Sequence, residues 1–226
     1  MKLRAIFSLL AALVIATVLT GIFSSPKPAA AHPLGNFTIN ALARLELLAG
    51  GEVRLRYIVD MAEIPAFQEL RAIDRDGDGA VSDAEAASYL DRIAPELVRN
   101  LDLHIGSERV TLTSSARGLS FPEGQGGLDT LRLTLDLTGA LPEGWQSGAA
   151  ANLSDGNYDG RIGWRQIVVL GGEGIVITET TALTADETAG LTLYPSSRLQ
   201  SPPDMRQARF RLEAGVSRCS EMRLTP

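Results

Sequence analysis

The sequence has very few of the residues that build covalent cross-links, transition-metal sites and histidine-dependent active sites. Its 226 residues include one cysteine, Cys219, and two histidines, His32 and His104. A single cysteine excludes an internal disulfide and any zinc or iron–sulfur site that needs several cysteines. No Ser-His-Asp order, phosphate-binding loop or dinucleotide fingerprint is present either. We therefore expect a protein that is not an enzyme.

Lysine is missing after Lys27, so every basic residue of the later chain is arginine. Lys2, Arg4 and Lys27 are the only basic residues in the first 31 positions, which contain no acidic residue. The rest of the chain carries 18 arginines against 27 acidic residues, a formal charge of −9. Nucleic acid is bound by neutralising its phosphates, so this acidic chain without a basic stripe argues against a nucleic-acid partner.

The first 31 residues have the features of a secretory signal peptide. Lys2 and Arg4 precede an apolar run at residues 6–19, and three alanines at 29–31 provide the small residues that a signal peptidase requires. Because the apolar run approaches the roughly 18 residues that begin to span a bilayer, an uncleaved anchor is the alternative. We expect an exported protein that is periplasmic, secreted or on the cell surface. Its membrane contact would come only from a retained leader.

Apolar and polar residues alternate with a period of two through most of the remaining chain. The pattern is clearest at residues 53–59 and 131–137, and it is typical of half-buried strands. Further strands are predicted at residues 37–47, 101–105, 109–113, 162–169, 174–181 and 208–212. Glycine and proline clusters separate these runs. The pattern predicts a mainly β domain at residues 32–215, an antiparallel β-sandwich, followed by a loose tail at 216–226.

Residues 63 to about 100 interrupt the strand pattern. Pro65 suits the first turn of a helix, and Leu90, Ile93 and Leu97 recur at helical spacing. We therefore predict a helix–loop–helix inserted between strands of the sandwich.

Residues 74–85 lie inside this insert and fit D-x-D-x-D-G-x5-E, the calcium loop of an EF-hand. Ca²⁺ is a hard cation that takes six to eight oxygen ligands. The pattern supplies carboxylates at positions 1, 3 and 5, a main-chain carbonyl at 7, a hydroxyl or its water at 9 and a bidentate carboxylate at 12. Gly79 at position 6 permits the sharp turn. The predicted ligands, in that order, are Asp74, Asp76, Asp78, Ala80, Ser82 and Glu85.

We expect one calcium ion with a structural role. A lone loop with a neutral Ser82 in an exported protein predicts weak affinity, on the order of 10⁻⁵–10⁻³ M. Calcium outside the cytoplasm would keep such a site filled, which favours a structural ion over a signalling switch. Without the ion, the carboxylates repel one another.

A second loop at residues 155–166 repeats part of this pattern. Asp155, Asn157, Asp159 and Gly160 give D-x-N-x-D-G, but position 12 is Gln166, which is not a charged bidentate ligand. The residues that follow predict a strand in place of the second helix. We favour a plain hairpin turn here, with a degenerate second calcium site as the alternative.

His32 gives the alternative function. Cleavage after Ala31 would make His32 the N-terminal residue, and an amine with an imidazole chelates Ni²⁺, Co²⁺ or Cu²⁺ through nitrogen. The chain would then be a periplasmic carrier of transition metals. An unliganded terminus is the simpler interpretation. His104 lies beside Asp102, and we expect it on the outer face of a strand.

Five stretches together resemble the extracytoplasmic N-terminal region of NicO-type bacterial nickel/cobalt transport proteins. They occur in order along nearly the whole chain after the leader: HPLGNFTIN at 32–40, YIVDMAEIP at 57–65, the loop at 74–85, NYDGRIGW at 157–164 and LQSPPD at 199–204. The resemblance implies a partner, a separate membrane metal transporter that uses this chain as an accessory domain.

Members of that family continue into a polytopic membrane domain with histidines and aspartates for metal transport. This chain stops at Pro226 without such a domain. We therefore do not expect transport from this polypeptide itself. It is expected to be either a free-standing relative or a truncated product.

Overall fold

The computed structural model describes residues 33–48 and 50–215. The predicted leader, His32 and the tail with Cys219 lie outside the described residues. Within the described part, no helix combines the length and the apolar character that crossing a bilayer requires.

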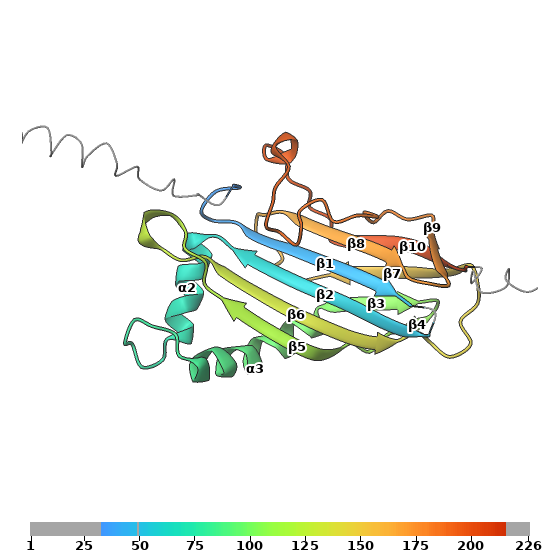
Figure 1. Ribbon diagram of the computed structural model, residues 1–226, viewed down its shortest axis with the longest axis horizontal. Helices are drawn as coiled ribbons and strands as arrows, with labels where there is room; N and C mark the ends of the chain where they lie inside the picture. Colours follow the sequence, from blue (N-terminus) through green and yellow to red (C-terminus); the bar gives the residue numbers. More distant parts are fainter. Residues whose placement is uncertain (1–32, 49, 216–226) are drawn as a thin grey trace, which may run out of the picture. The chain divides into compact units, whose positions relative to one another are not determined.

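The described residues form two five-stranded sheets, one in front of the other in Figure 1. The front sheet, sheet A, has the order β5 (Thr113–Ser120), β6 (Leu131–Ala140), β2 (Glu52–Met61), β1 (Ile39–Leu47) and β8 (Arg165–Gly171). Sheet B has the order β4 (Glu108–Arg109), β3 (Leu101–Ile105), β7 (Ala149–Asp155), β10 (Gln207–Ala214) and β9 (Ile175–Thr178). Two single turns of 3₁₀ helix lie in loops, η1 (Gln125–Gly127) and η2 (Ser196–Arg198).

The apolar residues of the alternating strands meet between the sheets. In β6 the four leucines at 131, 133, 135 and 137 are buried, while the polar residues between them are partly exposed. They share one apolar core with Leu153 of β7 and Phe210 of β10 in the opposite sheet. The prediction of a mainly β sandwich is therefore confirmed.

Two strands, β7 (Ala149–Asp155) and β5 (Thr113–Ser120), lack a clear alternation of apolar and polar residues in the sequence. β7 begins with three alanines, which hide the difference between its inner and outer faces, although Leu153 points into the core. β5 is an edge strand of small and polar residues that is exposed along most of its length. The strand predicted at 109–113 is wrong, because only Glu108 and Arg109 pair with β3 before the chain leaves the ladder.

One strand pair departs from the antiparallel pattern. β8 pairs with β1 in parallel, from Ala41 opposite Arg165 to Leu47 opposite Gly171. The chain crosses from β7 in sheet B to β8 in sheet A, so residues 155–166 do not form the hairpin turn that the sequence suggested. The reason is that this loop carries buried charges that join the two sheets, as described below.

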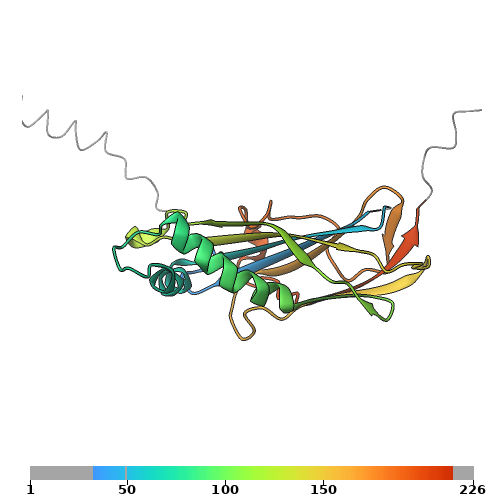
Figure 2. The same ribbon diagram turned by 90° about the horizontal axis from the view of Figure 1, so that it is seen from below.

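The predicted helical insert is confirmed, with α2 (Glu63–Ile73) and α3 (Asp83–Arg99) directly after β2. Ser82 and Glu85 form a capping box at the start of α3. Tyr89, Leu90, Ala94 and Leu97 bury one side of α3, and the helix contacts β5 and β3 along the open side of the sandwich (Figure 2). The Tyr89 hydroxyl donates a hydrogen bond to Glu69 Oε2 of α2 at 3.1 Å. Both ends of the loop between the helices are thereby fixed.

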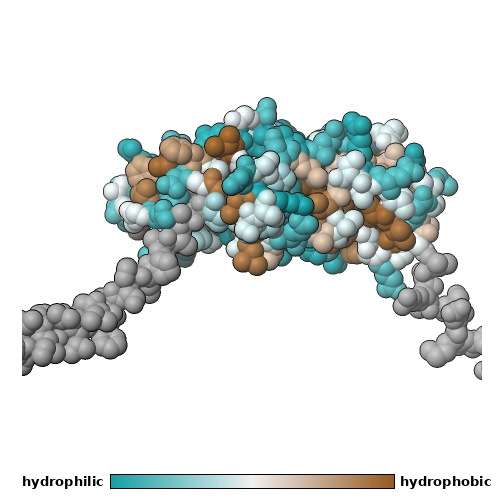
Figure 3. Space-filling model, turned by 90° about the horizontal axis from the view of Figure 1, so that it is seen from above, coloured by the Kyte–Doolittle hydropathy of each residue, from teal (hydrophilic) through white to brown (hydrophobic). Residues whose placement is uncertain are grey.

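A smaller apolar cluster covers the outer face of sheet A near β1 and β8. It contains Leu42, Ile58, Trp164, Val168 and Leu191. The Trp164 ring meets the Tyr194 ring edge-on, at 5.6 Å between centroids and 77° between planes. Trp164 is thus a packing residue with a satisfied polar edge, because its Nε1 donates to Gln166 Oε1 at 2.8 Å. On the face shown in Figure 3, the remaining exposed apolar residues are interspersed with hydrophilic ones.

The core predicts a large difference between two leucine truncations. Leu45 of β1 is 0% exposed, and Leu193 in a loop is 65% exposed. Leu45→Ala leaves a cavity between the sheets and is expected to cost roughly 2–5 kcal/mol of unfolding free energy. Leu193→Ala is expected to stay within about 0.5 kcal/mol of the parent. Urea unfolding followed by circular dichroism measures both, and equal losses would contradict the assigned core.

Candidate metal centre

The loop between α2 and α3 holds its shape through two glycines and a cap. Gly77 and Gly79 adopt left-handed conformations, with φ of 74° and 84°. Only glycine adopts such angles without strain, and Gly79 is the position at which the motif demands it. Ser82 then starts α3. The chain therefore doubles back over a few residues and brings its alternate side chains to one place.

The carboxylates of Asp74, Asp76 and Asp78 converge in this loop. One oxygen from each lies within 4.8 Å of the others. Two oxygens bound to one Ca²⁺ at 2.3–2.6 Å can be up to about 5 Å apart, so the spacing fits a single cation. Asp74 is partly buried, and Asp76 and Asp78 are exposed. These three aspartates can hold a metal ion.

Main-chain hydrogen bonds orient the three carboxylates. Asp74 accepts from the amides of Gly77 at 2.7 Å and Gly79 at 3.1 Å. Asp76 Oδ1 accepts from the Asp78 amide at 3.2 Å, and Asp78 Oδ1 accepts from the Ala80 amide at 2.8 Å. Each carboxylate keeps further lone pairs, because an ionised carboxylate has about four acceptor positions. The loop thus positions the aspartates without using up their capacity to bind a cation.

Glu85 does not belong to the group of three aspartates, and both of its carboxylate oxygens accept hydrogen bonds from other residues of the loop. Its Oε1 accepts from the Arg75 amide at 2.7 Å, and its Oε2 accepts from the Ser82 amide and hydroxyl at 3.0 and 2.8 Å. These hydrogen bonds, those from Ser82 and Arg75 first, favour the ionised form and lower the pKa of Glu85 to about 2. Glu85 therefore connects the second position of the loop to the ninth.

Of the six predicted ligands, the structure brings the three aspartates together. Ser82 and Glu85 are engaged with each other in the capping box. Ala80, whose carbonyl is the predicted ligand at position 7, lies in the exposed part of the loop beyond Gly79.

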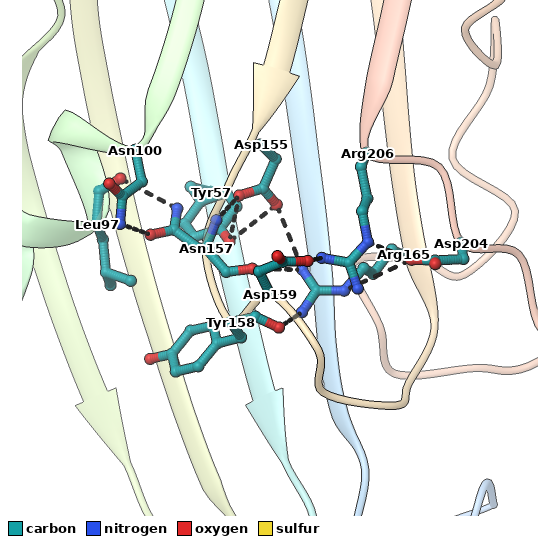
Figure 4. Close-up of polar contacts among 10 residues, drawn as sticks. All are labelled: Tyr57, Leu97, Asn100, Asp155, Asn157, Tyr158, Asp159, Arg165, Asp204 and Arg206. Carbon is teal, nitrogen blue, oxygen red and sulfur yellow. Dashed lines mark hydrogen bonds and ion pairs between the residues drawn. The ribbon is translucent and has the colours of Figure 1, made fainter.

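The second loop, residues 155–166, uses its acidic residues in another way (Figure 4). Asp155 is 6% exposed and accepts hydrogen bonds from the Tyr57 hydroxyl at 3.0 Å and the Asn157 amide at 2.9 Å. Its Oδ2 lies 3.8 Å from Nη1 of Arg165, which is 1% exposed. Burial raises the pKa of Asp155, and the hydrogen bonds and Arg165 oppose that rise. The first position of this loop is thus neutralised by an internal cation.

Asn157 fastens the same loop to the end of α3. Its Nδ2 donates to the Leu97 carbonyl at 3.0 Å, and its Oδ1 accepts from Asn100 Nδ2 at 3.2 Å. The Gly156 amide also donates to the Asn100 carbonyl at 3.0 Å. Asn157, the third position of this loop, therefore holds the C-terminal end of α3 and is not available as a metal ligand.

Arg165 organises the rest of the loop. Its two terminal nitrogens donate to the carbonyls of Asn157 at 2.9 Å and Tyr158 at 2.7 Å. Its Nε lies 3.7 Å from Asp204 Oδ1, and Asp204 and Asp159 both pair with Arg206 nearer the surface (Figure 4). Charges of alternating sign thus run from the core to the solvent.

These contacts argue against the degenerate second calcium site. Asp155 and Asn157 point into the body, whereas the Asp159 side chain is 87% exposed. Gln166 donates to Asp186 and Thr188 in another part of the chain. Within the described residues, the three aspartates of the first loop are the only group of three acidic, histidine or cysteine residues close enough for one ion. Nothing in the sequence marks Arg165 as buried, because an arginine in a half-buried strand normally lies on the exposed face.

His104 lies on the outer face of β3, as expected. Its side chain is 38% exposed, and its Nε2 is 3.2 Å from Asp102 Oδ1.

Comparison of the chain with protein-family models and with curated proteins gives no match.

The buried network predicts unequal effects for two arginine substitutions. Arg165→Met removes the cation beside Asp155 and the donors to two carbonyls, and it is expected to cost roughly 3–5 kcal/mol of unfolding free energy. Arg206→Met removes only exposed ion pairs, and it is expected to cost about 1 kcal/mol or less. Denaturant unfolding of both variants measures the difference. A small effect of Arg165→Met would show that the pair does not hold the sheets together.

Proposed function

We propose that this chain is an exported calcium-binding domain in which one EF-hand loop holds a structural Ca²⁺ ion. The observation that carries the proposal is the convergence of Asp74, Asp76 and Asp78 between two helices. An acidic surface loop has no need of a left-handed glycine at position 6, an apolar residue at position 8 and a helix at each end. The combination of these features favours the specific site over a solvated acidic loop.

The donor set favours calcium over softer metals. The loop offers carboxylate, hydroxyl and carbonyl oxygens, and it contains no histidine or cysteine. Oxygen donors suit hard cations such as Ca²⁺, Mg²⁺ and Mn²⁺, whereas nickel, copper and zinc prefer nitrogen or sulfur. Six potential oxygen ligands without fixed octahedral geometry suit Ca²⁺ better than Mg²⁺.

The position of the loop supports a structural role. A bound cation would offset the repulsion among three carboxylates and fix α2 against α3. α3 is in turn bonded to the second loop through Asn157, and that loop joins the two sheets. The ion would therefore stabilise an insert that is already attached to the sandwich at its far end.

We further propose that the domain is an accessory to a membrane transporter of nickel or cobalt. The support is the resemblance of its stretches to NicO-type proteins. Three of these stretches meet in space, because Tyr57, Asn157 and Asp204 belong to the network around Asp155 and Arg165. These three stretches therefore lie in one structural unit.

Calorimetric titration of the metal-free full chain tests the calcium site. We expect one Ca²⁺ per chain, with weaker binding of Mg²⁺. Glu85→Gln should remove most of the affinity, because the amide can keep the capping box but cannot act as a charged bidentate ligand. Asp83→Asn is the matched control, since it removes one neighbouring charge from a residue outside the predicted ligand set.

Two outcomes would contradict this function. Equal calcium affinity in the parent and in Glu85→Gln would refute the EF-hand mode of binding. Nickel binding without any response to calcium would move the chemistry to His32 and favour the metal-carrier alternative.

A structural ion also predicts a linked gain in stability. At a free Ca²⁺ concentration a hundred times the dissociation constant, the unfolding free energy should rise by about 2.7 kcal/mol. Urea unfolding with calcium and with a chelator measures this gain. Glu85→Gln should show little of it, and an equal gain in that variant would place the ion elsewhere.

A further inference from the structure

The outer face of sheet B carries a row of hydrogen-bond donors that the calcium site does not use. Along β3, β7 and β10 the inward residues are buried and the alternate residues face outward. The strand register places His104 opposite Asn152, and Asn152 opposite Arg209. These three side chains therefore lie side by side across three neighbouring strands.

A hollow of ≈ 340 Å³ lies over this row. Gly106 and Ala150 line it beside His104 and Arg211, and their small size leaves the space open. The volume is at the lower end of the range for small-molecule sites, about 300–1,000 Å³. The hollow can therefore take a small ligand or the end of a chain.

Arg209 is the uncompensated charge in the hollow. Arg211 pairs with Glu179 at 2.7 Å, and Arg109 at the end of the row pairs with Asp102 at 2.7 Å. The Arg209 guanidinium has no hydrogen bond or ion pair within the described part of the chain, where only its main chain is bonded, to Thr181. In a chain of net negative charge, this hollow thus presents one free cation.

Asn152 offers a further hydrogen-bond donor beside Arg209. Its Nδ2 donates to Ser154 Oγ at 3.1 Å. An amide nitrogen carries two hydrogens, so Asn152 keeps one for an acceptor in the hollow.

We propose that this hollow binds a carboxylate group, either of a small organic acid or of a polypeptide C-terminus. Arg209 is the charged partner, and His104 and Asn152 flank it with further N–H donors. The planar fork of a guanidinium matches the two oxygens of a carboxylate. A doubly charged phosphate fits less well, because Arg211 and Arg109 are already paired with Glu179 and Asp102, which leaves a single charge for the ligand.

Nuclear magnetic resonance titration of the full chain tests this site with four probes: acetate, succinate, inorganic phosphate, and one short peptide with a free or an amidated C-terminus. We expect the amide resonances of 104, 152 and 209 to shift with succinate or with the free-acid peptide. Arg209→Gln should weaken the binding about tenfold or more, as expected for loss of a charge-assisted pair. Arg54→Gln is the matched control, because Arg54 lies on sheet A and is paired with Glu52.

Ala150→Leu separates a built site from general attraction of anions. It fills the hollow and leaves every charge in place, so it should abolish the binding while the unfolding midpoint stays near that of the parent. If the small acids shift these resonances, the site recognises the carboxylate group by itself. If the free-acid peptide shifts them and the small acids do not, the ligand is the C-terminus of a polypeptide. No shift with any probe, stronger binding of phosphate than of succinate, or binding that survives in Arg209→Gln and Ala150→Leu would overturn the proposal.

Discussion

The charge pair between Asp155 and Arg165 is the constraint on which the arrangement of the molecule depends. Asp155 ends β7 of sheet B and Arg165 begins β8 of sheet A, so their contact joins the two sheets at one point. Two buried charges are costly unless hydrogen bonds satisfy them. Tyr57 and the carbonyls of Asn157 and Tyr158 supply those bonds. The same loop then holds the end of α3, so the cost of burial is offset by contacts that align three layers.

The two acidic loops share part of one residue pattern but place it in opposite environments. In the first loop, Asp74, Asp76 and Asp78 face one another in an accessible turn, and none of them forms an ion pair with a side chain in the described part of the chain. In the second, the guanidinium of Arg165 lies beside the buried Asp155 and supplies a permanent positive charge. The contrast follows from burial, because a permanent cation can be desolvated with its partner, whereas an exchangeable ion needs access to solvent.

The sequence predicted those parts of the structure in which side chains differ sharply in hydropathy. The alternating leucines of β6 predict both a strand and the side of it that is buried. The spacing of the acidic residues at 74–85 predicts both the loop and the side chains that converge in it. The alanine-rich β7, the polar edge strand β5 and the parallel pair of β1 with β8 give no such contrast. The buried Arg165 and the row across β3, β7 and β10 depend on pairings between distant segments, and spacing along one segment carries no information about them.

The parallel pairing of β1 with β8 also determines when the chain can fold. The bond from the Trp164 amide to Asn40 Oδ1 joins residues 124 positions apart. Contacts of such long sequence separation carry a large entropic cost of loop closure and slow the folding of a domain. Sheet A cannot be completed until β8 has emerged from synthesis. If the chain is exported, as proposed, and crosses the membrane unfolded, sheet A would be completed only after residues 165–171 have reached the far side.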